Sequence, residues 1–229
     1  MLPLAAFNRM GSGRQHWCRA CFLEYFHARG ALHRQQSGAA RRVRVARARS
    51  FVAAYLESHP CVDCGERDVR VLDFDHLRGK EACISELAAW GAPRARLAAE
   101  IAKCEVRCAN CHRRVTAHRA GWSRLAGDVD DPRRGLEAPV RRNLRHVHAV
   151  LAAGACVDRG ERNMLTLEFD HVGDKTGQVS TMVWNVSLET LVAEIAKCEL
   201  RCCNCHRRIT YERRAARAVQ ELQSGLRPP

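Results

Sequence analysis

Residues 99–114 read AEIAKCEVRCANCHRR and recur as residues 193–208, AEIAKCELRCCNCHRR, with fourteen of the sixteen positions identical. Upstream lies a second matched pair, LDFDH at residues 72–76 and LEFDH at residues 167–171. Matching positions in this upstream pair are 95 residues apart, which is long enough for each copy to form one small structural unit. Because both stretches are rich in Cys, His and acidic residues, the repeated unit is expected to bind metal.

Local patterns around the first copy predict short strands and helices. Apolar residues three or four apart over residues 41–58 indicate a helix, which His59-Pro60 would end. Strands are expected at residues 69–74 and 105–107. Helices are expected at residues 84–90, at residues 94–103 and from near Cys111 to His118. The predicted fold class is α+β, with two small modules and a basic, partly helical N-terminal arm.

The chain is expected to divide into five segments. Gly, Asp and Pro residues between positions 121 and 140 indicate a linker. The expected segments are an arm with one Cys-x-x-Cys pair (1–40), a first module (41–125), a linker (126–140), a second module (141–217) and a tail (218–229). Modules this small bury little apolar surface, so a bound metal is expected to stabilise each of them.

Paired cysteines supply the expected ligands. Cys61 and Cys64 form one Cys-x-x-Cys pair, and Cys108 and Cys111 form another. Four thiolates are the usual ligand set of a structural zinc ion. The second copy keeps Cys156, Cys202 and Cys205 but carries Arg159 where the first copy has Cys64. Since a guanidinium cannot ligate zinc, the second site is expected to bind Zn²⁺ more weakly, and the extra Cys203 is badly placed to substitute.

A further Cys-x-x-Cys pair, Cys18 and Cys21, lies in the arm without an obvious second pair. His27 and His33 follow and could complete a second zinc knuckle. Their spacing fits no standard zinc finger, so two free thiols in a loosely held arm are the alternative. The sequence leaves both interpretations open.

Positive charge is concentrated near the N-terminus. The chain has a formal net charge of +13, and its first fifty residues hold ten arginines against the single acid Glu24. This imbalance favours a polyanionic partner such as DNA, because binding releases the counterions condensed on phosphates. A solvated surface that reflects arginine-rich composition is the alternative. The candidate nucleic-acid contacts are Arg41, Arg42 and Arg44 in the predicted helix, and the pairs Arg113-Arg114 and Arg207-Arg208.

The sequence also predicts where the protein resides. The sequence does not begin with a signal peptide, which would show a charged segment, an apolar segment and a small-residue cleavage site in that order. It also contains no run of about 18 apolar residues, the length of a membrane span. We therefore expect an intracellular, cytoplasmic protein, in which paired cysteines are more often zinc ligands than disulfides.

Taken in order, the CxxCG, FDH and CxNCHRRxT motifs resemble the HNH endonuclease family in its zinc-knuckle branch, in tandem duplicate. The resemblance covers residues 61–116 and, with one departure, residues 156–210. It implies a ββα-metal fold, His76 and His171 as general bases, and a structural zinc held apart from the catalytic ion. It further implies that Mg²⁺ or Mn²⁺ is bound by Asp75 and His112 in the first module and by Asp170 and His206 in the second.

Two positions depart from the family pattern. Lys103 and Lys197 stand where the central Asn usually lies, whereas Asn110 and Asn204 lie inside the knuckles. These asparagines are candidates for orienting the base. Arg159 is the second departure, and it predicts that the first module is the main catalyst.

Three functional hypotheses follow from these motifs. The first is a metal-dependent endonuclease that hydrolyses DNA phosphodiester bonds. The second is a zinc-containing protein that binds nucleic acid without catalysis. The third, a zinc-stabilised protein-interaction module, is disfavoured by the basic arm.

Overall fold

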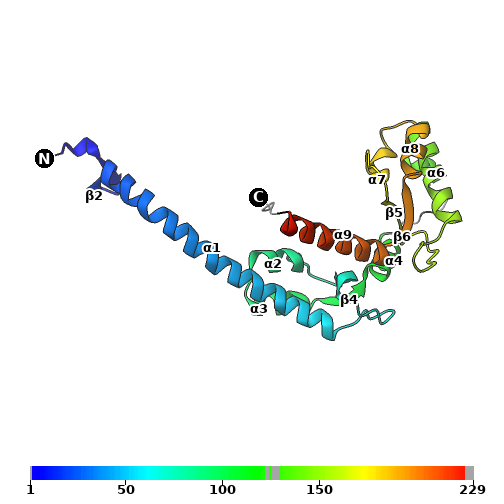
Figure 1. The fold of residues 1–229 in the computed structure, drawn as a ribbon, viewed down its shortest axis with the longest axis horizontal. Coiled ribbons are helices and arrows are strands. Elements are labelled where there is room, and N and C mark those ends of the chain that lie inside the picture. The colour runs from blue at the N-terminus through cyan, green and yellow to red at the C-terminus, as the bar shows by residue number, and fades with distance from the viewer. Residues whose placement is uncertain (1, 122–123, 125–128, 225–229) are drawn as a thin grey trace. The chain divides into compact units, whose positions relative to one another are not determined.

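The computed structural model describes residues 2–121, 124 and 129–224, without the side chains of residues 31–36. The chain forms two compact units, one of residues 1–53 and 80–102 and the other of residues 54–79 and 103–229. The elements are drawn in Figure 1. The expected α+β class is confirmed in its coarse form, since short two-stranded sheets accompany helices. Among the residues described, no helix has the length and apolar character that a membrane crossing requires.

The first unit begins with a hairpin and a long helix. After η1 (Leu4–Ala6), strands β1 (Phe7–Met10) and β2 (Gly13–Cys18) pair in antiparallel fashion and lead into α1 (Arg19–Ser58). The predicted helix is therefore present, but it begins at Arg19 rather than at residue 41. Gly30 and Gly38 cost about 1 kcal/mol each within a helix, and they do not interrupt this one.

Two short helices complete the first unit. They are α2 (Ile84–Trp90), as predicted, and α3 (Arg94–Ile101), which ends two residues earlier than predicted. Gly91 ends α2 with a φ of 71°, and a Cβ there would meet Arg44 Cβ at 2.9 Å. The side chain of Arg94 lies over the Phe51 ring, 5.0 Å from its centroid. Only a glycine allows α2 to approach α1 this closely.

The second unit contains the strands and the following helix of both copies of the repeated motif. The first repeat consists of β3 (Leu72–His76), β4 (Cys104–Cys108) and α4 (Ala109–Ala120). The second repeat consists of β5 (Leu167–His171), β6 (Cys198–Cys202) and α9 (Cys203–Gln223). In each repeat the strands are antiparallel, with Asp75 opposite Glu105 and Asp170 opposite Glu199. The first strand was predicted from residue 69, but residues 69–71 form η2 because the Asp68 carboxylate accepts the Arg70 N–H.

Helices α6 (Ala138–Ala153), α7 (Val179–Met182) and α8 (Leu188–Ile195) surround the second sheet. Leu151, Leu167 and Leu191 form the fully buried centre of this core. Pro139 at the first turn starts α6 inside the predicted linker, where η3 (Pro132–Arg134) also lies. The predicted tail is helical as far as Gln223. Linker residues 126–128 and tail residues 225–229 lie outside the described residues.

The two repeats are joined by a reciprocal pair of hydrogen bonds. The Asn110 N–H donates to Asn204 Oδ1 at 3.0 Å, and the Asn204 N–H donates to Asn110 Oδ1 at 3.1 Å. Each asparagine is the second residue of its helix, where the backbone N–H has no partner within the helix. Each side chain thus caps the helix of the other repeat. The predicted role of these asparagines in orienting the base stays a prediction, and their observed contact is with each other.

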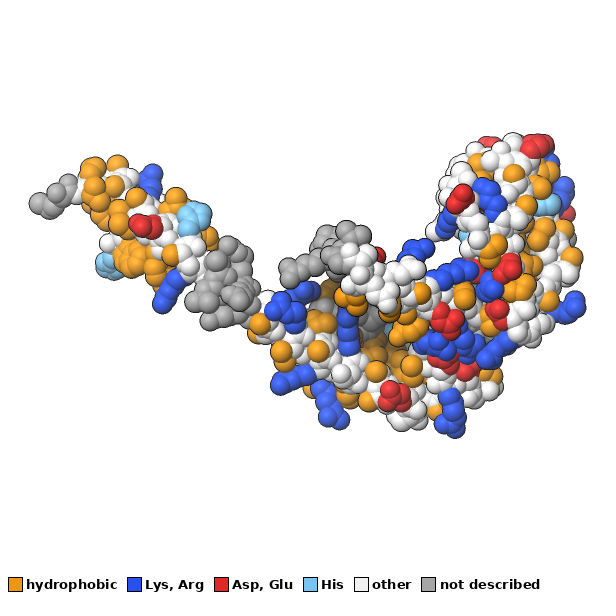
Figure 2. Space-filling view, in the orientation of Figure 1, with side chains coloured by type: hydrophobic (Ala, Val, Ile, Leu, Met, Phe, Trp, Pro, Cys, Tyr) orange, Lys and Arg blue, Asp and Glu red, His pale blue; other side chains and the backbone are white. Residues whose placement is uncertain are grey.

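Ion pairs surround this contact in the same reciprocal pattern. They link Arg113 to Glu168 and Arg207 to Asp73, and Arg114 to Glu161 and Arg208 to Glu66. Each pair joins the same two motif positions with the repeats exchanged, which defines a two-fold, self-complementary interface. Blue and red side chains interleave where α4 and α9 begin (Figure 2). The second unit is therefore an internal pseudo-dimer.

This interface supplies carboxylate partners for the four arginines that were predicted to contact phosphate, and the phosphate contact stays a prediction. The arginine pairs of both repeats are engaged by carboxylates of the opposite repeat. Burial raises the pKa of Glu168, but hydrogen bonding from His206 and the charges of Arg113 and His206 outweigh it and lower the pKa to about 2. The carboxylate is therefore ionised at neutral pH and attracts the guanidinium throughout the physiological range.

Charge reversal tests this interface. Arg114→Glu or Glu161→Arg alone should lower the free energy of unfolding by about 1–3 kcal/mol, because each leaves a half-buried charge facing its like. The double variant should recover most of that loss. Urea unfolding measures all three. Arg96→Glu, at an exposed position of α3, serves as control. A double variant whose loss in free energy of unfolding equals the sum of the two single losses would contradict the pairing.

Candidate functional site

The first cysteine cluster has the dimensions of a zinc site. The Sγ atoms of Cys61, Cys64, Cys108 and Cys111 all lie within 4.8 Å of one another. Cys64 Sγ and Cys108 Sγ are 3.7 Å apart, close to the edge of about 3.8 Å expected for a tetrahedron with Zn–S bonds of about 2.3 Å. The turn that contains Cys61 and Cys64 ends at Gly65, which has a φ of 75°, and the start of α4 carries Cys111. The predicted convergence of these cysteines is confirmed.

The thiol chemistry of the cluster fits a divalent cation. Burial raises the pKa of Cys64 to about 11, and burial together with neighbouring thiols raises the pKa of Cys111 further. Four thiolates this close would repel one another without a compensating charge. A bound Zn²⁺ supplies that charge and would couple metal binding to folding of the knuckles.

The second cluster contains three thiols. The ligand atoms of Cys156, Cys202 and Cys205 lie within 4.8 Å of one another, and no further Cys, His, Asp or Glu of the described residues joins this group. Arg159 is 61 % exposed, with Nη1 3.7 Å from Glu66 Oε2. Cys203 donates its thiol to the Thr166 carbonyl, so it stands apart as predicted. Three thiolates leave one tetrahedral position for a ligand from outside this set.

Cys18 and Cys21 repeat the local geometry of the helix-borne knuckles. Cys18 ends β2, Cys21 lies in the first turn of α1, and the Cys21 N–H donates to Cys18 Sγ at 3.4 Å. No third ligand joins them among the described side chains, which do not include that of His33. The structure therefore brings together two thiols here, and the second zinc knuckle stays a prediction.

A histidine between two carboxylates forms the next part of the site. Asp73 and Asp75 are two residues apart on β3, so they face the same side of the sheet. His112 Nδ1 lies 3.3 Å from Asp73 Oδ2, and His112 Nε2 lies 3.6 Å from Asp75 Oδ1. The sequence analysis did not identify Asp73 as a partner of His112. The acids at alternate positions of LDFDH were the signal, because alternate residues of a strand face the same side.

The second repeat holds its histidine in the same way. His206 Nδ1 lies 2.7 Å from Glu168 Oε2, and His206 Nε2 lies 3.6 Å from Asp170 Oδ1. Glu168 was also missed as a partner of the histidine. A ring nitrogen that bonds to a carboxylate fixes the imidazole and leaves the other nitrogen for a ligand.

Arginines compete for the buried aspartates. Asp75 accepts Arg107 Nη1 and Arg119 Nη1, both at 2.8 Å. Asp170 accepts Arg201 Nη1 at 2.8 Å and Arg213 Nη1 at 2.6 Å. The 3.6 Å spacing of the predicted ligand atoms is within reach of one cation with bonds of about 2.1 Å. A divalent ion therefore fits at each aspartate only in one of two ways. It must displace one arginine from the carboxylate, or it must share the carboxylate with that arginine.

A buried glutamate fixes the ring of His171. His171 Nε2 lies 2.9 Å from Glu194 Oε1, and the same oxygen accepts the N–H groups of Thr176 and Gly177. Glu194 is only 2 % exposed, and hydrogen bonds from Lys197 and from Gly177 lower its pKa. An ionised carboxylate accepts a hydrogen, so we assign the ring proton to Nε2 and a free lone pair to Nδ1.

This arrangement gives a role to one departure from the HNH pattern. Lys197 Nζ lies 2.7 Å from Glu194 Oε2. The lysine therefore fixes the carboxylate of Glu194, which in turn orients the ring of His171. In the first copy Glu100 accepts the N–H groups of Glu81 and Ala82, at positions matching those around Glu194. Sequence analysis missed both glutamates, although both lie within the repeated AEIAKCE stretch.

The three candidate residues of the second repeat open onto one cavity. It has a volume of about 230 Å³ and is lined by Asp170, His171, His206, Phe169, Thr210, Lys175, Arg213, Arg214 and Arg217. Four cationic side chains in so small a space favour an anionic ligand.

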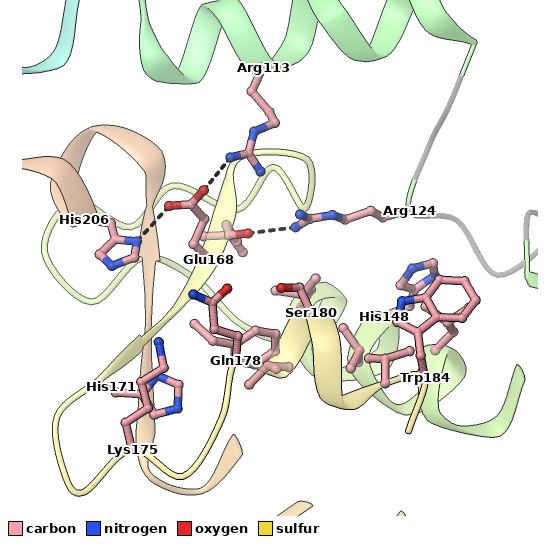
Figure 3. A pocket seen from close by; sticks show the side chains of 17 residues that line it. Arg113, Arg124, His148, Glu168, His171, Lys175, Gln178, Ser180, Trp184 and His206 are labelled. Carbon is pink, nitrogen blue, oxygen red and sulfur yellow. Dashed lines mark hydrogen bonds and ion pairs between the residues drawn. The ribbon is translucent and has the colours of Figure 1, made fainter. Parts of the chain in front are cut away.

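A larger cavity of about 560 Å³ lies on the α6 and α7 side of His171 and His206. Figure 3 shows Glu168 between Arg113 and His206 at one end, with His171 and Lys175 nearby. Leu144, Val147 and Val183 are among its apolar lining residues. His171 and His206 therefore line both this cavity and the smaller, basic one.

Comparison with protein-family models, with curated proteins and with solved structures finds no match to this chain. The cysteine clusters are compatible with zinc binding, and the chemistry of the Asp–His sites rests on their geometry and on the motif resemblance.

A matched exchange tests the cysteine clusters. Arg159→Cys should restore a four-thiolate set and strengthen zinc binding at the second cluster, because the variant thiol would stand where Cys64 stands in the first. Cys64→Arg should weaken the first cluster to the level of the second. Zinc content after dialysis against graded chelator measures both. Unchanged zinc retention in Arg159→Cys would show that this position does not face the ion.

Proposed function

We propose that this chain is a metal-dependent endonuclease that hydrolyses phosphodiester bonds of DNA. The observation that carries the proposal is the convergence of Asp170, His171 and His206 on a cavity lined by four cations. A base with a free lone pair, a carboxylate–imidazole pair and an electropositive wall are the groups that phosphodiester hydrolysis requires. The matching residues of the first repeat are Asp75, His76 and His112.

His171 Nδ1 would take a proton from the attacking water. Glu194 would stabilise the imidazolium that forms and keep the ring oriented, while Lys197 holds Glu194 in place. Lys175 and Arg214 would bind the phosphate oxygens. When bound by Asp170 and His206, Mg²⁺ or Mn²⁺ would polarise the phosphate and stabilise the leaving alkoxide. A neutral imidazole positioned next to the attacking water is suited to accept this proton.

DNA affinity is assigned to the exposed arginines of α1. Arg41, Arg42 and Arg44 are all exposed there, and the arm before them is rich in further arginines. Contacts of this kind bind the backbone without reading sequence. The arginines of the repeat interface are already engaged and contribute little to this affinity.

The second candidate function is nucleic-acid binding by a zinc-containing protein without catalysis. The observation that favours it is the pairing of each buried aspartate with two arginines, which satisfies the carboxylate without any metal. The two functions differ in whether a divalent cation displaces those arginines.

Substitution of the bases tests the proposal. With Mg²⁺ or Mn²⁺, the protein should cut supercoiled plasmid, and chelator should stop it. His76→Ala should lower the rate at the first site by about 10²–10⁴-fold, the usual contribution of a general base, and leave the slower cutting by the second site. His171→Ala should have a smaller effect, because its zinc knuckle lacks the fourth thiolate. Asp75→Ala and His112→Ala should act as His76→Ala does.

The control for these variants is His118→Ala, which removes an exposed histidine from the same helix as His112. DNA binding, measured by fluorescence anisotropy, should survive in every variant. Full cleavage by His76→Ala under matched metal would show that the base is misassigned. Absence of cleavage by the parent, with binding intact, would favour the non-catalytic alternative.

Glu194 is a positioning residue, and Glu194→Gln tests it. In a His76→Ala background, where only the second repeat cuts, the substitution should lower kcat by about 10–100-fold with little change in KM, because substrate contacts remain. Glu189→Gln, on the exposed face of α8, is the matched control. Equal effects on kcat and KM would instead indicate a loosened fold.

A further inference from the structure

The pseudo-two-fold axis of the second unit passes between Asn110 and Asn204. Three kinds of reciprocal contact define it: the exchanged Asn hydrogen bonds, the Arg113–Glu168 and Arg207–Asp73 pairs, and the Arg114–Glu161 and Arg208–Glu66 pairs. The axis therefore relates the two candidate sites to each other. This internal symmetry constrains the substrate that both sites can act on together.

The sites lie close to the axis because of chain connectivity. His112 follows Asn110 by two residues, and His206 follows Asn204 by two. With consecutive Cα atoms about 3.8 Å apart, the two histidine Cα atoms are less than about 25 Å from each other. That limit is shorter than one turn of B-DNA, about 34 Å.

The interface is also linked directly to the sites. Asp73 accepts Arg207 of the second repeat and lies 3.3 Å from His112 of the first. Glu168 pairs with Arg113 of the first repeat and lies 2.7 Å from His206 of the second. Each histidine therefore contacts a carboxylate of its own repeat, and that carboxylate is paired with an arginine of the opposite repeat. Neither candidate site is complete without the other repeat.

From these contacts we propose that the chain is an internal dimer that cuts both strands of one DNA duplex within a single helical turn. The two strands of DNA are antiparallel and related by two-fold axes, so a two-fold protein presents equivalent groups to opposite strands. The inference rests on the proposed nuclease function and specifies its substrate as duplex DNA and its product as a double-strand break.

Each site would carry out one hydrolysis. A water oxygen bonds to phosphorus as the bond from phosphorus to one sugar oxygen breaks. The histidine takes the water proton, the departing oxygen takes a proton from solvent water, and the histidine then releases its proton to solvent, leaving a phosphomonoester and a hydroxyl on each strand. Arg159 in place of the fourth thiolate makes the second site the slower one, so a nicked intermediate precedes the linear product.

The experiment uses supercoiled plasmid in excess over the full-length protein with Mg²⁺ or Mn²⁺. Linear DNA should appear while supercoiled molecules remain, which independent random nicks do not produce. Sequenced ends should carry paired cuts on opposite strands, fewer than about ten base pairs apart. His76→Ala and His171→Ala should each yield nicked circles and no early linear product.

Interface variants separate docking from catalysis. Arg114→Glu should lower the ratio of early linear to nicked product while nicking continues, and Arg114→Glu with Glu161→Arg should restore the ratio. A parent that nicks but never makes paired cuts would overturn this inference and leave the nuclease function standing. A parent that cuts no DNA would overturn both. A ratio unchanged by Arg114→Glu, with docking shown to be weakened, would also overturn it.

Discussion

The reciprocal caps between Asn110 and Asn204 are the constraint on which the second unit depends. Both side chains are nearly buried, at 9 % and 6 % exposure, at helix ends whose N–H groups lack partners within the helix. An isolated repeat would leave one of these groups unsatisfied, so burial of the helix start requires the other copy. The residue before each helix, Cys108 or Cys202, belongs to a cysteine cluster that could hold zinc. The contact between the repeats and the candidate zinc sites therefore share the same helix ends.

Charge compensation at the aspartates determines what the candidate sites can do. Asp75 and Asp170 are almost fully buried, and each is neutralised by two arginines. A buried carboxylate needs such partners, since removing it from water without them is costly. The same arginines oppose a cation at the adjacent histidine. The nuclease proposal therefore requires an exchange of partners at these aspartates when metal and phosphate bind.

Local patterns predicted the elements better than the contacts between them. The clustering of Cys61, Cys64, Cys108 and Cys111 and the helix Ile84–Trp90 were predicted from spacing and periodicity, which are local properties. The partners of Arg114 and Asn110 were not predicted because each partner lies 47 or 94 residues away, in the other repeat. Glu194 was missed because the loop at Thr176 and Gly177 must fold onto it before its role is visible. The HNH resemblance stays a hypothesis about function.

The most direct measurement is anomalous X-ray diffraction from crystals of the full chain grown with Mn²⁺, collected at the zinc and manganese absorption edges. The account predicts zinc at the centre of the four-cysteine cluster. It also predicts manganese between Asp75 Oδ1 and His112 Nε2, with the Arg119 guanidinium moved away from the carboxylate. A cysteine cluster without zinc, or an Asp75 still paired with both arginines and free of manganese, would contradict it.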